Sequence, residues 1–531
     1  MMSTPSARAV RADRGCRPRE WLAALVLALI GCGGGSSPGT PAVPPGQQGL
    51  MTRGPYLQHA ADGVVVAWYT PAPGEGRVRF FSDAGATGEA VAPAGTTRRE
   101  ATLRGLVPGV RYNYRVYSPL AQLASTSGDV EFSFRAPDRE LLRFVVFGDC
   151  GTGSAAQHAV ARAIAAEAVA PDLVMIAGDV IYPPADASAW DARFFAPYRA
   201  LLPAVRFYAV PGNHDYEIQG GKPFFEVFTL PRNGPDGLVP ESSYWLERAG
   251  AVLIAHDTNQ SVALLRQEAV PWHTEIARRA ATFRLVFQHQ SMYSSGPNFA
   301  EPPSPQLREL LSPVYSATGV DVVFNGHDHL YERTRPIGGV IYVTTGAGGA
   351  ELYARAATNP FTLAFANDRH GYTHVELSGR ALLLRQMDTT GRAYDAFALT
   401  KAVTAADPLR AFTGAGAPPR GWSGPGFDDS GWPEASSLPG RLQARRGFDV
   451  ARLGSVREAV LRVRGVSDYR VRLNDVEVAR GGVAEAAPAA FTLPAALLRE
   501  GRNALALDGF SAGGEALKPS LELVLVGSAP R

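Results

Sequence analysis

The stretch Val-Val-Phe-Asn-Gly-His-Asp-His at positions 322–329 decides the fold of this chain. Its apolar start predicts a buried strand. Gly326 would let the backbone turn sharply where the strand ends, so that His327 and His329 are presented at that edge. Imidazole is the commonest metal ligand, but a lone His-x-His is also compatible with the polar face of an ordinary strand. The rest of the chain distinguishes the two interpretations.

Four further apolar runs precede it, and each ends in polar residues of the same kind. They are 144–147 followed by Asp149, 173–177 followed by Asp179 and Tyr182, 207–211 followed by Asn213, His214 and Asp215, and 285–288 followed by His289. Helical patterns such as 154–168 alternate with these runs, which predicts an α/β domain. Ligands of α/β sheets lie outside the carboxyl ends of the strands, so five strand ends can converge on one point.

The side chains gathered in this way have a definite chemistry. Apart from His214 and Asp215, they are two carboxylates, a phenolate, an amide oxygen and three imidazoles, which suit iron, zinc or manganese and exceed what one metal ion requires. Two metal ions about 3.5–4 Å apart lower the pKa of a bridging water to make hydroxide and hold both sides of a displacement at phosphorus. The sequence therefore predicts a two-metal site.

The motifs Gly-Asp-x-Gly, Gly-Asp-x-x-Tyr, Gly-Asn-His-Asp, Val-x-x-His and Gly-His-x-His resemble the metal-binding blocks of purple acid phosphatases, which are calcineurin-like metallophosphoesterases. The resemblance covers about residues 50–400. It implies Fe3+ bound by Asp149, Asp179, Tyr182 and His329, and Zn2+, Mn2+ or Fe2+ bound by Asp179, Asn213, His289 and His327, with Asp179 shared.

The same resemblance implies an acid phosphatase that hydrolyses small phosphate monoesters. His214 would be the outer-sphere general acid that protonates the leaving alkoxide, and Asp215 would orient it. Many relatives carry another His shortly after the fourth block, whereas this chain has Tyr-Ser-Ser-Gly-Pro-Asn-Phe at 293–299. A phosphodiesterase with the same metal site is an alternative. A non-enzymatic, glycan-binding surface protein is another, which the presence of all seven ligands disfavours.

The α/β region is predicted to be a sandwich spanning residues 138–400. A β-sandwich is expected before it and another after it in the sequence. Residues 50–137 resemble a fibronectin type III domain, in which Tyr112 would cap a strand-crossing corner. Residues 405–531 resemble a galactose-binding-like jelly roll through the run Phe-Asp-Asp-Ser-Gly-Trp-Pro at 427–433. Such modules bind glycans or only support the neighbouring domain, and both roles remain open. The predicted fold class is therefore multidomain.

The first residues predict export. An Arg-rich start, an apolar run and small residues indicate a signal peptide at 1–31. Leu-Ile-Gly-Cys at 29–32 resembles a lipoprotein cleavage site, which implies a lipid on Cys32 and a Gly/Ser/Pro-rich tether at 32–49, although ordinary secretion is the alternative. The formal net charge is +2, of which the signal contributes +3, so the remainder near −1 argues against a nucleic-acid partner.

Overall fold

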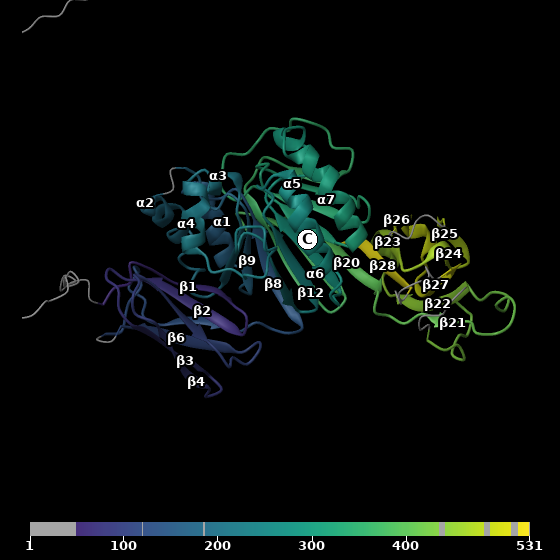
Figure 1. The fold of residues 1–531 in the computed structure, drawn as a ribbon, viewed down its shortest axis with the longest axis horizontal. Helices are drawn as coiled ribbons and strands as arrows, with labels where there is room; N and C mark the ends of the chain where they lie inside the picture. Colours follow the sequence, from purple (N-terminus) through teal and green to yellow (C-terminus); the bar gives the residue numbers. More distant parts are fainter. Residues whose placement is uncertain are drawn as a thin grey trace, which may run out of the picture. The chain divides into compact units, whose positions relative to one another are not determined.

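The computed structural model describes residues 49–118, 121–183, 186–434, 441–482, 489–510 and 519–529. The predicted signal peptide, Cys32 and nearly all of the predicted tether lie outside these residues. The described strands form four sheets, and the longest of these runs through the three regions predicted from the sequence (Figure 1). None of the described helices has the length and apolarity that crossing a bilayer requires.

The N-terminal region is a β-sandwich. One layer contains β1 (Arg53–Ala60), β2 (Gly63–Tyr69) and β5 (Arg98–Leu103), and the other contains β3 (Gly76–Ser82), β4 (Thr87–Ala92), β6 (Arg111–Tyr117) and β7 (Phe132–Arg135). Inward-facing side chains alternate along β6, as expected for a half-buried strand. The buried Tyr112 hydroxyl accepts a hydrogen bond from the Val107 N–H (2.9 Å), which ties down the chain before β6. The fibronectin type III assignment stays a prediction.

The central region consists of two packed sheets. The first holds β8 (Leu141–Phe147), β9 (Leu173–Ala177), β10 (Arg206–Val210), β18 (Gly371–Ser378), β19 (Ala381–Asp388) and β20 (Ala393–Val403). The second holds β11 (Tyr244–Arg248), β12 (Ala251–His256), β13 (Phe283–Gln288), β14 (Val322–Asn325), β15 (Tyr331–Thr334), β16 (Ile341–Thr345) and β17 (Thr362–Ala366). Strands β8, β9 and β10 are parallel, as are β12, β13, β14 and β16.

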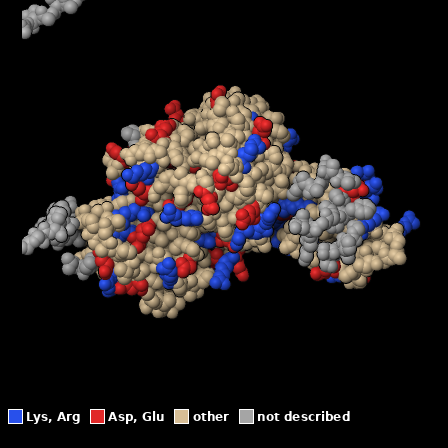
Figure 2. All heavy atoms as spheres, in the orientation of Figure 1, with Lys and Arg blue, Asp and Glu red and all other residues tan. Residues whose placement is uncertain are grey.

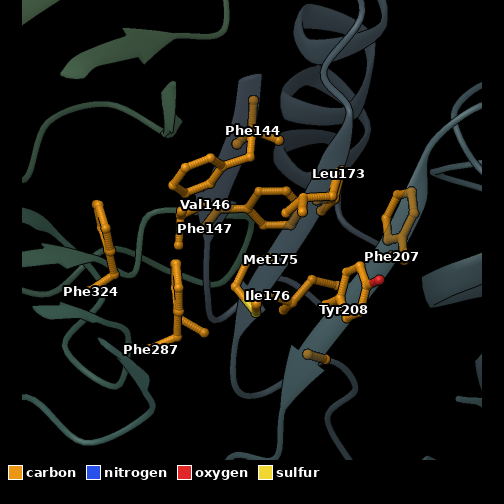
Figure 3. Packing of buried hydrophobic residues seen from close by; sticks show 14 of the residues in the cluster. Phe144, Val146, Phe147, Leu173, Met175, Ile176, Phe207, Tyr208, Phe287 and Phe324 are labelled. Atoms are coloured by element: carbon orange, nitrogen blue, oxygen red, sulfur yellow. The ribbon is translucent and has the colours of Figure 1, made fainter. Parts of the chain in front are cut away.

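Aromatic side chains join these two sheets (Figure 3). Phe144 of β8 lies 5.9 Å from Phe287 of β13 and 6.3 Å from Phe324 of β14, measured between ring centroids. Phe287 and Phe324 stack on each other at 5.2 Å. All three belong to apolar runs that the sequence predicts as buried strands. Their burial holds the carboxyl ends of strands from different sheets at a fixed separation.

Seven helices and several shorter segments connect the described strands of the central region. They are α1 (Ala155–Ala165), α2 (Ala187–Trp190), α3 (Asn213–Tyr216), α4 (Lys222–Val227), α5 (Val262–Leu264), α6 (Val270–Ile276) and α7 (Ser304–Thr318), with short π and 3-10 segments η1 (Asp191–Phe195), η2 (Gln219–Gly221), η3 (Leu265–Ala269) and η4 (Pro297–Phe299). The helix predicted over 154–168 begins after the cap Ser154, whose side chain accepts from the Gln157 N–H. It ends early, and Glu167 beyond it contacts Tyr372 and His374.

The C-terminal region is a second sandwich. One sheet contains β21 (Arg410–Ala411), β22 (Arg441–Val450), β24 (Ser467–Leu473), β25 (Val476–Gly481) and β27 (Gly501–Phe510), and the other contains β23 (Val456–Arg464), β26 (Ala489–Pro494) and β28 (Ser520–Ser528); η5 (Leu453–Ser455) and η6 (Ala495–Leu497) connect strands. Strand β28 pairs with β20, and β1 pairs with β10. The longest sheet is therefore continuous in the order β26-β23-β28-β20-β19-β18-β8-β9-β10-β1-β2-β5.

A buried charge network joins the C-terminal sandwich to the central region. Lys401 Nζ lies 2.6 Å from Asp321 Oδ1, Arg462 lies 2.8 Å from the same oxygen, and both cations also contact Glu522. Burial alone would raise the pKa of Glu522, but Lys401 and Arg462 lower it below its ordinary value. Asp321 immediately precedes β14, so this network supports the strand that leads to His327. Elsewhere, positive and negative side chains are mixed over the visible face (Figure 2).

Candidate metal centre

The predicted ligands lie at strand ends that face one another across the two central sheets. Asp149 follows β8, Asp179 follows β9, Asn213 follows β10, His289 follows β13, and His327 and His329 follow β14. In the described part of the chain, ligand atoms of Asp149, Asp179 and His289 lie within 4.8 Å of one another. The structure thus brings together side chains that are up to 180 positions apart in the sequence.

Asp149, Tyr182 and His329 form one contact group. The Tyr182 hydroxyl lies 3.1 Å from His329 Nε2, and Asp149 Oδ1 lies 3.5 Å from the same nitrogen. His329 Nδ1 donates to the Glu351 carbonyl (2.7 Å), so Nε2 carries the lone pair and faces the two oxygens. The Asp149 carboxylate is fully buried and accepts from the His327 N–H.

Asp179, Asn213, His289 and His327 form the second group. His289 Nε2 lies 3.0 Å from Asn213 Oδ1, 3.2 Å from His327 Nδ1 and 3.3 Å from Asp179 Oδ1. His289 Nδ1 donates to the Ala177 carbonyl (3.0 Å), so the proton of a neutral imidazole is on Nδ1 and Nε2 is bare. His289 Nε2, which carries no proton, therefore lies beside the Asn213 and Asp179 oxygens, and these oxygens can only accept hydrogen bonds. This is an arrangement that a cation stabilises.

Burial shifts the pKa values of these groups toward the uncharged forms. It raises the pKa of Asp149 well above its usual value, and the nearby charge of Asp179 raises it further. Burial likewise raises the pKa of Asp179. It lowers the pKa of His289 and of His327 to about 3. Neutral imidazoles beside carboxylates that repel each other fit bound metal ions, and the donor set suits two of them.

The backbone is strained at three of these residues. Asp149 (φ 57°), Asp179 (φ 52°) and His327 (φ 69°) adopt the left-handed conformation that non-glycine residues rarely adopt. Each of them follows a glycine directly. The left-handed conformation turns the chain at the strand end and carries the ligand side chain toward the facing sheet.

Gly326 does not have the role expected from the sequence. The sharp turn after β14 is made at His327 rather than at Gly326. Gly326 is needed for close approach, because a Cβ there would collide with the Asp149 carboxylate and the Ala177 carbonyl. Gly212 is similar, since a Cβ there would collide with Asp179. These glycines leave room for carboxylates supplied by neighbouring strands.

His214 lies beside the two contact groups and belongs to neither. Its ring centroid is 4.6 Å from that of Tyr182, and its Nε2 is 4.0 Å from Asp179 Oδ2. Its Nδ1 lies 2.8 Å from Glu217 Oε1. Nδ1 therefore lies close to a carboxylate, although not in hydrogen-bonding geometry, while Nε2 lies on the side of Asp179. No sequence motif indicated Glu217, although its spacing three residues after His214 was a usable signal.

The Asp215 carboxylate bonds to backbone groups in the described part of the chain, and its expected role in orienting His214 stays a prediction. Its buried carboxylate accepts hydrogen bonds from the backbone N–H groups of Gly212 (2.8 Å), Ile181 (3.1 Å) and Val180 (3.2 Å), and Glu217 is the carboxylate that contacts His214. Burial and the charge of Asp179 raise the pKa of Asp215 to about 8. Asp215 therefore joins the loops after β9 and β10, while the carboxylate beside His214 Nδ1 comes from Glu217, two positions further along the chain.

Tyr353 is a site residue that the sequence did not indicate. Its ring stacks on the His329 imidazole with the centroids 3.9 Å apart and an angle of 16° between the planes. Burial and the charges of Asp149 and Asp179 raise the pKa of Tyr353 to about 12. It lies eight positions beyond β16 in a segment without a recognisable motif, so only the tertiary structure shows it at the centre.

Residues 142–331 match the family described as calcineurin-like phosphoesterase. This match includes every predicted ligand, and the chain therefore carries a calcineurin-like metallophosphoesterase domain. Its relatives include purple acid phosphatases. A protein of Arabidopsis thaliana named Fe(3+)-Zn(2+) purple acid phosphatase 12 is 25% identical over 395 residues, which are 64% of this chain and 81% of that protein.

Other relatives are similar over a smaller part of their length, and one of them is named as inactive. Probable inactive purple acid phosphatase 1 of Arabidopsis thaliana is 23% identical over 359 residues, and the alignment spans 57% of each chain. The chain thus spans little more than half the length of that relative. A purple acid phosphatase from yellow lupin (Lupinus luteus) seeds shares the fold, with a TM-score of 0.56, 20% identity and coverage of 65% of this chain and 73% of that chain.

Proposed function

We propose that the protein is a dimetal acid phosphatase that hydrolyses small phosphate monoesters. The observation that carries this proposal is the division of the predicted ligands into two contact groups, one around His329 Nε2 and one around His289 Nε2. Each group offers oxygen and nitrogen donors to one metal ion. The Asp179 carboxylate would be shared by the two ions. A non-enzymatic scaffold has no need for such an arrangement.

The residues fit the two metal ions expected from the sequence. Fe3+ would be held by Asp149, Asp179, Tyr182 and His329, because a phenolate prefers ferric iron, and Zn2+, Mn2+ or Fe2+ would be held by Asp179, Asn213, His289 and His327. When bound, such ions balance the charge of the phosphate group and supply the nucleophile by making water more acidic.

The chain itself supplies the proton for the leaving group. Glu217 lies beside His214 Nδ1, and Nε2 lies on the side of the centre, 4.0 Å from Asp179 Oδ2. As the ester P–O bond breaks, Nε2–H donates its proton to the alkoxide oxygen, and the alcohol leaves neutral. The exposed third of the His214 side chain is consistent with access from solvent for reprotonation.

A phosphodiesterase is the second candidate. A Hordeum vulgare protein named nucleotide pyrophosphatase/phosphodiesterase is 23% identical over 328 residues and is covered over 86% of its length. A screen of phosphate release from mono- and diesters, with metal content measured on the same sample, tests both functions. Faster turnover of monoesters supports the first proposal. Faster turnover of diesters replaces it with the second, and a fully metallated protein without turnover of either ester refutes both.

We also propose that the protein is exported and anchored by a lipid on Cys32, with the tether giving the folded regions their reach. The C-terminal sandwich is proposed to support the central region rather than to bind glycan. The continuous β20–β28 pairing and the buried contacts of Arg462 and Glu522 with Asp321 and Lys401 support this role.

A further inference from the structure

The loop at 346–353 is hydrogen-bonded to ligand residues from both central sheets. The Ala350 N–H donates to the Asp149 carbonyl (2.8 Å), and the Tyr353 N–H donates to the His329 carbonyl (3.0 Å). Asp149 follows a strand of the first sheet, whereas His329 follows a strand of the second. The loop therefore holds its own side chains at a fixed position relative to the candidate metal centre.

Three constraints fix Tyr353. Its N–H is bonded to His329, its carbonyl accepts from the Asn367 side chain (3.0 Å), and its ring stacks on the His329 imidazole. The Tyr182 hydroxyl approaches the edge of the same imidazole at Nε2. His329 is thus bounded by one phenol at its face and another at its edge.

The two phenols differ in what their hydroxyl groups can do. The Tyr182 hydroxyl is committed to His329 Nε2, where it is a predicted metal ligand. The Tyr353 side chain is only half-buried, and within the described ranges its hydroxyl has no hydrogen-bond partner. The ring that carries this hydroxyl stacks directly on His329, a predicted metal ligand. A free donor therefore lies at the margin of the centre, where an anionic group would bind.

We propose that Tyr353 is a substrate-binding residue. Its hydroxyl donates a hydrogen bond to an oxygen of the phosphate group, and its ring fixes the plane of the His329 imidazole. This inference rests on the proposed function, because it assumes that a phosphate group binds at the centre. The two contributions can be separated, since Phe keeps the ring and removes only the hydroxyl, whereas Leu removes both.

The test compares Tyr353→Phe, Tyr353→Leu and the control Tyr117→Phe, which removes a hydroxyl from β6 of the N-terminal sandwich. The measurements are KM and kcat on an alkyl phosphate, the dissociation constant of inorganic phosphate by calorimetry, and metal content. A hydrogen bond to a charged group is worth enough that Tyr353→Phe should raise KM and the phosphate dissociation constant about tenfold. Metal content should stay at the wild-type value.

Tyr353→Leu should show the same loss of phosphate affinity and, in addition, a lower metal content or a displaced visible absorption, because the His329 ring is no longer held. Tyr117→Phe should match wild type throughout. Phosphate affinity and KM of Tyr353→Phe that are indistinguishable from wild type overturn the inference, while ester hydrolysis by wild type still supports the proposed function. A wild-type protein that hydrolyses no ester, but whose phosphate affinity falls in Tyr353→Phe, refutes only the proposed function.

Discussion

At the scale of single residues, the contact between His214 and Glu217 gives the proposed general acid a testable signature. His214→Ala should keep both metal ions and should slow hydrolysis of alkyl phosphates by roughly 10²- to 10⁴-fold, the usual contribution of a positioned acid. Aryl phosphates should suffer less, because p-nitrophenolate needs little protonation. Steady-state rates on both ester classes and metal analysis check this. Equal losses on both classes would contradict the acid role.

Asp179→Ala is the comparison for that variant. Asp179 contacts His289 and lies between the two ligand groups, so its loss should remove metal and activity on both ester classes. Glu217→Gln belongs to the same series, because the amide oxygen can still face His214 Nδ1. It should retain far more activity on alkyl phosphates than Glu217→Ala if orientation is what Glu217 supplies.

Tyr182 determines the expected colour of the protein. A phenolate bound to Fe3+ gives a visible charge-transfer band, and the Tyr182 hydroxyl is already in contact with His329, the other expected ligand of that ion. Tyr182→Phe should therefore abolish the band while leaving the fold intact, as absorption and circular dichroism spectra would show. A colourless wild-type protein that is fully metallated and active would refute the ferric assignment.

At the scale of strands and loops, Gly326 tests how closely the sheets approach. Gly326→Ala places a methyl group against the Asp149 carboxylate and the Ala177 carbonyl, so the Asp149 side chain must move. Metal content should fall sharply, and the midpoint of thermal unfolding should also fall, because the Ala177 carbonyl belongs to the backbone and cannot move away freely. Gly454→Ala, at a glycine with open space around its Cβ position, is the matched control. Normal metal content in Gly326→Ala would show that the carboxylate does not need this space.

The sequence predicts the strands of the central region well, because each is a short apolar run that ends in a polar turn. It also predicts that the ligands lie at one edge, since parallel strands end together. The pairing of β1 with β10 and of β28 with β20 could not be predicted, because it joins regions that look independent along the chain. Tyr353 and the true partners of Asp215 were missed for a related reason: their contacts depend on backbone positions.

At the scale of the whole molecule, the buried charges provide a test of the proposed supporting role of the C-terminal sandwich. Arg462→Met removes the ion pairs of Arg462 with Asp321 and Glu522 and leaves those of Lys401, and breaking such a buried pair costs about 3–5 kcal/mol. Arg480→Met is the control, since its ion pair with Glu477 is exposed and is worth about 0–1 kcal/mol. Chemical denaturation measures both values. A neutral effect of Arg462→Met would contradict the supporting role.

The proposed lipid anchor is a second property of the whole molecule. Wild type should remain in the membrane fraction, and Cys32→Ser should release the protein or leave the signal peptide uncut. Fractionation followed by mass spectrometry of the N-terminal peptide checks this. Wild-type protein found in the medium without lipid on Cys32 would contradict the anchor and favour ordinary secretion.

The left-handed backbone at Asp149, Asp179 and His327 has a consequence for how such a protein changes over generations. Each strained residue costs about 1–3 kcal/mol, which the proposed metal binding and, at Asp149 and Asp179, hydrogen bonds from backbone N–H groups offset. A lineage released from selection for catalysis would gain stability by replacing these residues with glycine, which tolerates the same backbone. Substitutions that abolish metal binding at these positions are therefore expected to increase the free energy of unfolding. Retention of all three residues is the expected sign of continuing selection for catalysis.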